Sequence, residues 1–145
     1  LIFANSFPHA DADPNTVLAH RLMPSLRDGS VFRLADVYTE PWDTVQVINA
    51  DEKLNEWTWR TLCAFDAGFA DRPQGQQLLV FWLEGGVSRM VRFTHSAGMP
   101  WFETDANAED GTIIGRDSAV FRATLVEDGG IRYYHCTPTS GPVAV

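Results

Sequence analysis

Two cysteines and four histidines are the side chains of this 145-residue chain best suited to nucleophilic chemistry. Cys63 lies in a predicted helix, and His95 and His135 lie in or beside predicted strands, so a thiol and an imidazole could meet as in thiol hydrolases. Such nucleophiles benefit from a helix N-terminus, whereas Cys63 is expected near the C-terminal end of its helix, where the helix dipole opposes a thiolate. A small Cys-dependent hydrolase using Cys63 with His95 or His135 is therefore the alternative hypothesis.

Other catalytic, cofactor and metal motifs are missing from the sequence. The chain has no G-x-S-x-G elbow, no G-x-G-x-x-G loop and no G-K-[ST] loop, which excludes a serine nucleophile on such an elbow and the common phosphate-binding loops. No two histidines are spaced at i,i+2 or i,i+4, and two cysteines cannot supply a structural zinc site. We therefore assign no catalytic residue and expect neither a metal nor a cofactor.

The two cysteines can instead be linked to each other. At about 100° per residue, Cys63 and Trp59 lie on the side of a predicted helix over 51–66 that is opposite to Leu54, so a second segment must cover that side. A C-terminal segment carrying Cys136 would cover it, and we predict a Cys63–Cys136 disulfide. In a reducing compartment the same two side chains would be buried small hydrophobes.

Charge and hydropathy restrict the partners. With 11 basic and 19 acidic residues the net charge is −8 and the pI is about 4.8, so the surface potential repels nucleic acid and we expect no nucleic-acid partner. A basic protein is the natural complement, because opposite potentials steer two proteins together. No apolar run approaches the ~20 residues that cross a bilayer, so we expect no transmembrane segment in this chain.

Five tryptophans are available as binding anchors. Trp42 and Trp101 lie at the ends of predicted strands, where an exposed indole ring can enter a partner's pocket. An acidic loop follows Trp101 and would surround it with negative charge. The candidate binding residues are Trp42, Trp101, Phe102, Asp105, Glu109 and Asp110. The open alternative is that the indole rings belong to the core and the acids only keep the loop solvated.

The elements that position these residues follow from hydrophobic periodicity. A helix is predicted over 14–23, and Pro24 kinks or ends its weaker continuation over 24–28. Strands are predicted over 31–38 and 43–48, where apolar residues alternate with polar ones.

The segment 51–66 is the strongest helix of the sequence, and Asn49 followed by Glu52 predicts its capping arrangement. Its core face is expected to carry Leu54, Trp57, Thr58, Thr61, Leu62 and Phe65. Two Gly-Gly pairs predict the turns of two β-hairpins. The hairpin strands are expected over 78–83, 87–94, 118–126 and 131–137, with a further strand over 100–105.

These elements predict a single α+β domain over 14–137, an antiparallel β-sheet built of hairpins with one or two helices packed on it. The simplest arrangement is one packed sheet with a helix laid across it. Residues 1–13 are expected to form an extended N-terminal arm, and 138–145 a mobile tail.

The strand Trp42-Asp43-Thr44-Val45-Gln46-Val47, the helix after it and the hairpin LLVFWLEGGVSRMVRF resemble small uncharacterised exported proteins and lipoproteins of bacteria. The resemblance implies an extracytoplasmic protein, secreted or anchored to the cell envelope, and supplies no catalytic residue. Ala10-Asp11-Ala12 has the form of a signal-cleavage site, and Leu1-Ile2-Phe3 fits the end of a removed membrane anchor upstream, although an ordinary N-terminal arm explains both. We therefore predict a non-catalytic exported or cell-envelope protein that acts as a protein-binding or accessory module.

Overall fold

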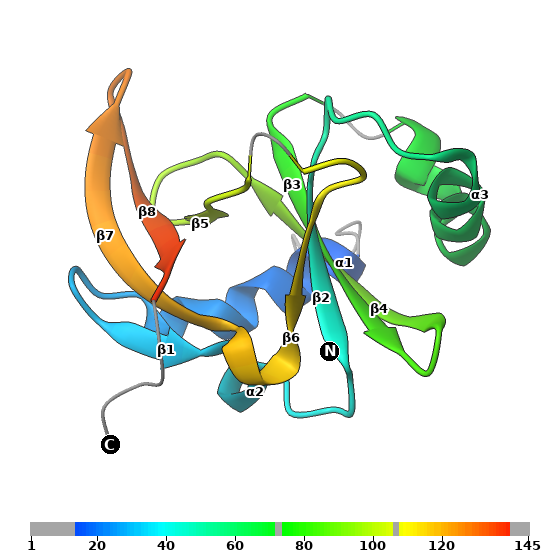
Figure 1. Ribbon diagram of the computed structural model, residues 1–145. Helices are drawn as coiled ribbons and strands as arrows, with labels where there is room; N and C mark the ends of the chain where they lie inside the picture. Colours follow the sequence, from blue (N-terminus) through cyan, green and yellow to red (C-terminus); the bar gives the residue numbers. More distant parts are fainter. Residues whose placement is uncertain (1–13, 72–73, 106–107, 140–145) are drawn as a thin grey trace, which may run out of the picture.

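The computed structural model describes residues 14–71, 74–105 and 108–139, which form two four-stranded β-sheets with short helices around them (Figure 1). The predicted single α+β domain with antiparallel strands is confirmed. The expected single sheet is wrong, because the strands divide into two layers. No helix in these ranges is long and apolar enough to cross a bilayer.

The first sheet, sheet A, has the strand order β1-β7-β8-β5. β1 (Val31–Arg33) pairs antiparallel with β7 (Val120–Asp128), which forms the predicted hairpin with β8 (Ile131–Pro138). β5 (Pro100–Phe102) completes the sheet and runs parallel to β8. The turn residues Gly129-Gly130 both have positive φ, which explains why this hairpin turns at glycines.

The second sheet, sheet B, has the strand order β4-β3-β2-β6, and all its neighbours are antiparallel. Its strands are β2 (Thr44–Asn49), β3 (Gln76–Leu83), β4 (Gly86–Thr94) and β6 (Thr112–Gly115). The hairpin predicted from a Gly-Gly pair is β3–β4, and the residues with positive φ in its turn are Glu84 and Gly85.

The burial of β3 explains why one layer is not enough. Five consecutive residues of this strand are buried, so both of its faces are covered. Leu79 and Phe81 belong to the core cluster between the two sheets, whereas Leu78 and Val80 belong to a smaller cluster on the outer face of sheet B. Part of that outer face is covered by α3 (Glu56–Phe65), which contributes Leu62 to the smaller cluster. A strand that is apolar on both faces requires a layer on each side.

The helix predicted over 51–66 begins later than expected. Asn49 and Glu52 do interact, since the Asn49 N–H donates to Glu52 Oε1 at 2.8 Å, but they close a turn instead of opening a helix. The N-cap is Asn55, whose side chain accepts from the Thr58 N–H at 2.8 Å. A second capping signal six residues downstream therefore sets the start of α3.

The buried face of α3 is also narrower than predicted. Only Thr58 and Leu62 are buried, whereas Trp57 is 61% exposed and Phe65 is 45% exposed. Leu54 precedes the helix and is half-buried against the smaller cluster. The helix lies at one side of the domain beside sheet B, so one narrow stripe is enough to attach it (Figure 1).

The N-terminal helix is short and changes type at its middle. α1 (Pro14–Ala19) is followed by the 3-10 helix η3 (His20–Ser25), which contains Pro24. The strand predicted over 31–38 ends at Arg33, because the next residues turn into a single helical turn that buries Leu34 and, after it, Tyr38. The remaining short helices are α2 (Leu34–Val37), η4 (Ala67–Asp71) and η5 (Arg116–Ser118).

The C-terminal end of sheet A extends into the predicted tail. Pro138 is the last residue of β8, and the Thr139 N–H donates to the Val120 C=O at 3.0 Å. The rest of that tail, 140–145, and the predicted arm over 1–13 lie outside the described residues.

The side chain of Gln77 joins the two sheets. It lies on β3 of sheet B, is fully buried, and pairs with the backbone of Phe102 on β5 of sheet A. Its Oε1 accepts from the Phe102 N–H at 2.8 Å, and its Nε2 donates to the Phe102 C=O at 2.8 Å and to Asn49 Oδ1 at 3.0 Å. β5 is an edge strand of sheet A, so the N–H and C=O of Phe102 that point away from β8 have no strand partner. The Gln77 amide supplies one acceptor and one donor for them.

The predicted Cys63–Cys136 disulfide is wrong, because both residues are free cysteines. Cys136 on β8 is fully buried in the cluster between the sheets. Cys63 on α3 packs against the smaller cluster on the outer face of sheet B. The helix is covered by sheet B and not by the C-terminal segment, so sheet B separates the two sulfur atoms.

We expect Gln77→Leu to lower the free energy of unfolding by about 2–5 kcal/mol, because two buried backbone groups of Phe102 lose their partners. Urea denaturation measures this change. Gln74→Leu, at an exposed position in the preceding turn, is the matched control and should alter the free energy by less than about 0.5 kcal/mol. Equal midpoints for the two variants would show that the amide is not needed to join the sheets.

Thiol titration of the unfolded protein without reductant is expected to find both cysteines free. In the native state burial raises the pKa of the Cys136 thiol to about 12, so Cys136 should react with Ellman's reagent only as fast as the protein unfolds. Half-buried Cys63 should react sooner. Cys63→Ala and Cys136→Ala separate the two rates, and equal rates would contradict the assigned burial.

Candidate functional site

The structure divides the residues of the predicted binding surface. Trp42 and Phe102 are only 4% and 1% exposed, so both are core residues and leave the candidate set. The Trp42 indole N–H donates to the Tyr38 C=O at 2.9 Å, and its ring contacts Phe81 and the Arg116 guanidinium. For Trp42 the alternative of a core position is the one found, and Phe102 is a core residue as well.

Trp101 and the acidic loop have different surroundings. Trp101 is half-buried on sheet A, with its ring centroid 5.0 Å from that of His95. Asp105 and Glu109 are exposed, and Asp110 reaches to the N-terminus of α3, where it forms several hydrogen bonds. Asp110 is therefore part of a surface built around α3 and sheet B.

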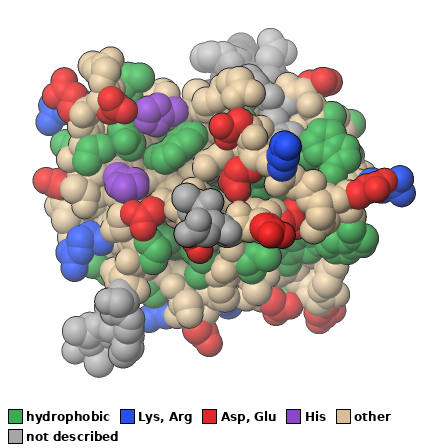
Figure 2. Space-filling model, turned by 45° about the horizontal axis from the view of Figure 1, so that its top comes forward, with side chains coloured by type: hydrophobic (Ala, Val, Ile, Leu, Met, Phe, Trp, Pro, Cys, Tyr) green, Lys and Arg blue, Asp and Glu red, His purple; other side chains and the backbone are tan. Residues whose placement is uncertain are grey.

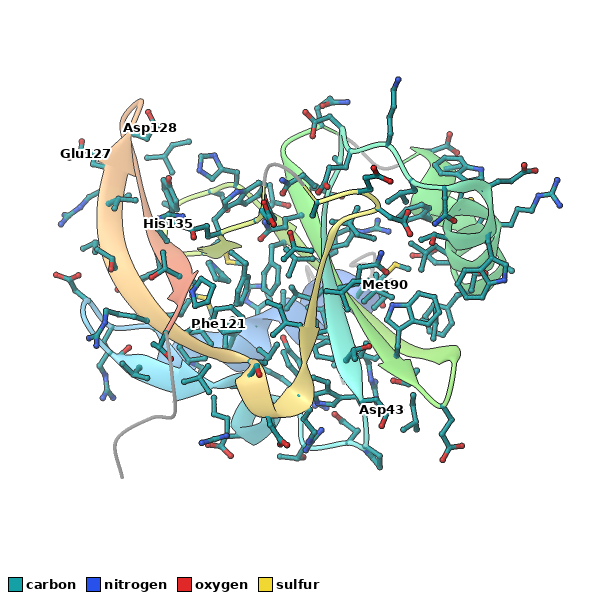
Figure 3. The ribbon with its side chains drawn as sticks, viewed as in Figure 1. Asp43, Met90, Phe121, Glu127, Asp128 and His135 are labelled. Atoms are coloured by element: carbon teal, nitrogen blue, oxygen red, sulfur yellow. The ribbon has the colours of Figure 1, made fainter. Side chains whose placement is uncertain are left out.

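The structure does not pair Cys63 with a histidine. Cys63 packs against the cluster that contains Met90, whereas His135 lies on sheet A in the opposite half of the molecule (Figure 3). The His95 ring packs against Trp101. In the described ranges no hydrogen bond joins Cys63 to either histidine, so no observation favours the Cys-dependent hydrolase.

α3 leaves part of the outer face of sheet B uncovered. Beside the helix a pocket of about 480 Å³ opens to solvent, with β2, β3 and β6 as its floor. Its lining includes Asp43, Thr44, Trp57, Trp82, Asp110 and Ile113. Asp43, the residue immediately before β2, lies at one end of the pocket (Figure 3).

Two indole rings stack in this pocket. Trp57 of α3 and Trp82 of β3 have ring centroids 5.7 Å apart and an interplanar angle of 21°. Trp57 is 61% exposed, and Ile113 of β6, across the pocket floor, is 62% exposed. Large apolar side chains that are exposed together are typical of a binding surface.

A chain of hydrogen bonds holds the Trp82 ring in place. The Trp82 Nε1–H donates to Gln46 Oε1 at 3.0 Å, and Gln46 Nε2 donates to the Asp110 C=O. The Asp110 carboxylate accepts from the N–H and the side-chain amide of Asn55 and from the Thr58 hydroxyl. Asn55 and Thr58 open the helix that carries the other indole ring, so one network positions both rings.

The backbone of Asp110 and Gly111 makes this network possible. Both residues have positive φ, 64° and 83°. A Cβ atom at position 111 would lie 2.9 Å from the Val47 carbonyl oxygen, so only glycine lets the loop lie against β2. This close approach places the Asp110 carboxylate at the N-terminus of α3, where the helix dipole stabilises an anion.

The pocket is acidic. It contains the carboxylates of Asp43 and Asp110, and no Lys, Arg or His is among its described lining residues. One Asp43 oxygen accepts from the Glu84 N–H at 2.8 Å. The second Asp43 oxygen, the Thr44 hydroxyl and the Trp57 indole N–H have no protein partner in the described part of the chain, so they are available to a ligand. Acidic side chains also lie among apolar ones on the face shown in Figure 2.

Sequence reasoning missed this pocket because it assigned Trp57 to the core face of the helix 51–66. Trp82 was not assigned to a site, because it lies in an apolar run that is typical of a buried strand. The signal that pointed to the pocket was in β2, where Thr44 and Gln46 alternate with buried valines. Such alternation indicates one polar face, and the polar face of β2 is the pocket floor.

Comparison of the chain with protein-family models, with curated proteins and with solved structures found no match. Within the described residues no group of three or more His, Cys, Asp or Glu side chains is placed to hold a metal ion. The positive observations from which a function can be inferred are the two stacked indole rings and the two carboxylates beside them.

Asp110→Ala should separate the two indole rings, because it removes the acceptor that anchors the start of α3. The exciton-coupled circular dichroism of stacked indoles measures their contact, and Trp57→Phe identifies the part of the spectrum that belongs to this pair. We expect Asp110→Ala to lose most of that signal and about 1–3 kcal/mol of the free energy of unfolding. Glu109→Ala, at the exposed neighbouring position, is the control and should retain both.

Proposed function

We propose that the protein is a non-catalytic binding module, an exported or cell-envelope accessory protein that holds a cationic side chain of a basic protein partner in the Trp57–Trp82 pocket. The observation that carries the proposal is the stacked indole pair, with Trp57 61% exposed, beside two carboxylates. No basic side chain among the described lining residues balances those carboxylates.

Arginine is the side chain that fits this pocket best. A guanidinium group is planar, so it stacks on an indole ring while its N–H groups bond to a carboxylate, and a cation–π contact of this kind contributes about 0.5–2 kcal/mol. Asp43 has an unpaired oxygen for such a bond. The protein uses the same contact elsewhere, where the half-buried Arg116 guanidinium lies 4.8 Å from the centre of the Trp42 ring.

A neutral ligand rich in hydroxyl groups fits less well. Binding such a ligand requires many free donors and acceptors, but Gln46, Asn55 and Thr58 already bond to protein groups. Their polar atoms position the indole rings and are not free for a ligand. The net charge of −8 favours a cation at longer range as well, because it raises the encounter rate with basic proteins.

The extracytoplasmic location belongs to the same proposal. It is supported by the resemblance of the 42–47 strand and the 78–93 hairpin to small exported proteins of bacteria. The two free cysteines are compatible with either compartment, since each is packed as a small apolar side chain in its own cluster.

The test is a titration of the 15N-labelled protein with N-acetyl-argininamide, followed through the indole N–H resonances. We expect the Trp57 and Trp82 signals to shift and the signal of buried Trp42 to stay. N-acetyl-citrullinamide has the same shape without the charge and should produce little shift. Equal shifts with both compounds would show that the pocket does not select a cation.

Two variants locate the interaction. Trp57→Ala should abolish the response, and Asp43→Asn should weaken it about two- to fivefold, the effect of one exposed ion pair. Trp101→Phe is the matched control on sheet A and should leave the affinity unchanged. A response that survives Trp57→Ala and disappears in Trp101→Phe would place the site on sheet A and contradict the proposal.

A further inference from the structure

Strand β6 leaves one edge of sheet B unpaired. It is the last strand in the order β4-β3-β2-β6, and no other strand of the described chain pairs with its second side. The Arg116 N–H donates to the Asp43 C=O at 2.9 Å. In an antiparallel pair every second residue bonds to the neighbouring strand, so this bond shows which residues of β6 face β2. Ile114 therefore directs its backbone groups to β2, whereas Ile113 and Gly115 direct theirs away from the sheet.

The free edge and the aromatic pocket meet at Ile113. Its side chain is 62% exposed and lines the pocket on the outer face, whereas Ile114 packs against the core between the sheets. Unpaired N–H and C=O groups on an exposed edge are a template on which an extended segment of another protein can pair.

The charges around β6 select the segment that pairs there. Asp110 lies just before the strand, exposed Asp117 lies just after it, and Asp43 lies beside it, immediately before β2. Arg116, the basic residue next to the edge, is half-buried, and its guanidinium lies over the Trp42 ring and bonds to the Trp42 C=O. An edge with negative charge at both ends favours a positively charged partner strand.

We propose that an extended, arginine- or lysine-bearing segment of the basic partner adds to β6 as a fifth strand of sheet B and inserts a cationic side chain into the Trp57–Trp82 pocket. This inference rests on the proposed function and specifies how the partner binds. The backbone groups of Ile113 and Gly115 supply the main-chain hydrogen bonds, and the pocket supplies the selection for charge.

Strand spacing makes this arrangement feasible. Neighbouring strands lie about 4.8 Å apart, so an added strand lies about 10 Å from β2. A side chain on the outer face of the added strand extends across Ile113 of β6 towards the pocket. Trp82 of β3 and Trp57 of α3 line the other side of that pocket. A long side chain such as arginine spans the gap, whereas a short one stays over Ile113.

The experiment uses an acetylated and amidated octapeptide of alternating threonine and arginine, and calorimetry measures its dissociation constant. Two further peptides carry N-methyl groups on every threonine or on every arginine, so each loses the N–H donors of one strand edge. We expect one of them to bind at least tenfold more weakly and the other to bind nearly as well as the parent. Ile113→Pro removes the outward N–H of β6 and should also cost at least tenfold, whereas Ile113→Ala keeps that N–H and should cost less than threefold.

The outcomes separate this inference from the proposed function. If the octapeptide is insensitive to both N-methyl series and to Ile113→Pro while N-acetyl-argininamide still shifts the Trp57 and Trp82 signals, strand addition is overturned and the cation pocket stands. If neither probe affects those signals, the proposed function fails. A dimer of the protein alone that Ile113→Pro converts to monomer would show that the edge belongs to a second copy, which also overturns the inference. The N-methyl peptides test the intact protein, so they decide the question even if Ile113→Pro disturbs the fold.

Discussion

One buried amide holds the two sheets of this protein together at their shared end. Gln77 bonds to both backbone groups of Phe102 and to the side chain of Asn49, so the ends of β2, β3 and β5 meet at a single side chain. Further along the chain from β5 lies Asp110, whose carboxylate accepts from the N-cap residue Asn55 and whose C=O accepts from Gln46. The aromatic pocket therefore depends on a contact between the sheets, because that contact fixes where the loop to Asp110 begins.

Both faces of sheet B are apolar, but only its inner face is completely covered by other parts of the described chain. Sheet A closes its inner face, whereas α3 closes the outer face over Leu78, Val80 and Met90 and leaves the rest to solvent. Stacking of Trp57 on Trp82 reduces the apolar area that the uncovered part exposes. The hydrogen bonds of the pocket keep the rings in one orientation, so a ligand does not have to order them, and that saves part of the entropy cost of binding.

The sequence predicted the local structure of this fold better than its layers. The two glycine turns, the strand after Trp42 and the α+β class follow from short-range patterns, and these are the features that the structure confirms. Cys63 and Trp57 were misassigned because a helical wheel shows which residues share a side but not which side meets the protein. Asn55 competed with Asn49 as the N-cap, and Asp110, far along the chain, favours the later start. The pocket brings together residues from β2, β3, α3 and β6, and no single stretch of sequence contains that combination.

The strand order of sheet A also sets the order in which the chain can fold. Among the described strands β1 pairs with β7 alone, so Val31 must wait for Arg122 before it gains this strand partner. The β3–β4 hairpin, in contrast, closes from neighbouring residues and can form while the chain is still short. During synthesis the ribosome therefore releases β1 long before its partner exists, and its edge stays open until the C-terminal hairpin emerges. Until then Phe32, which is buried in the finished domain, stays open to chaperones and to wrong pairing.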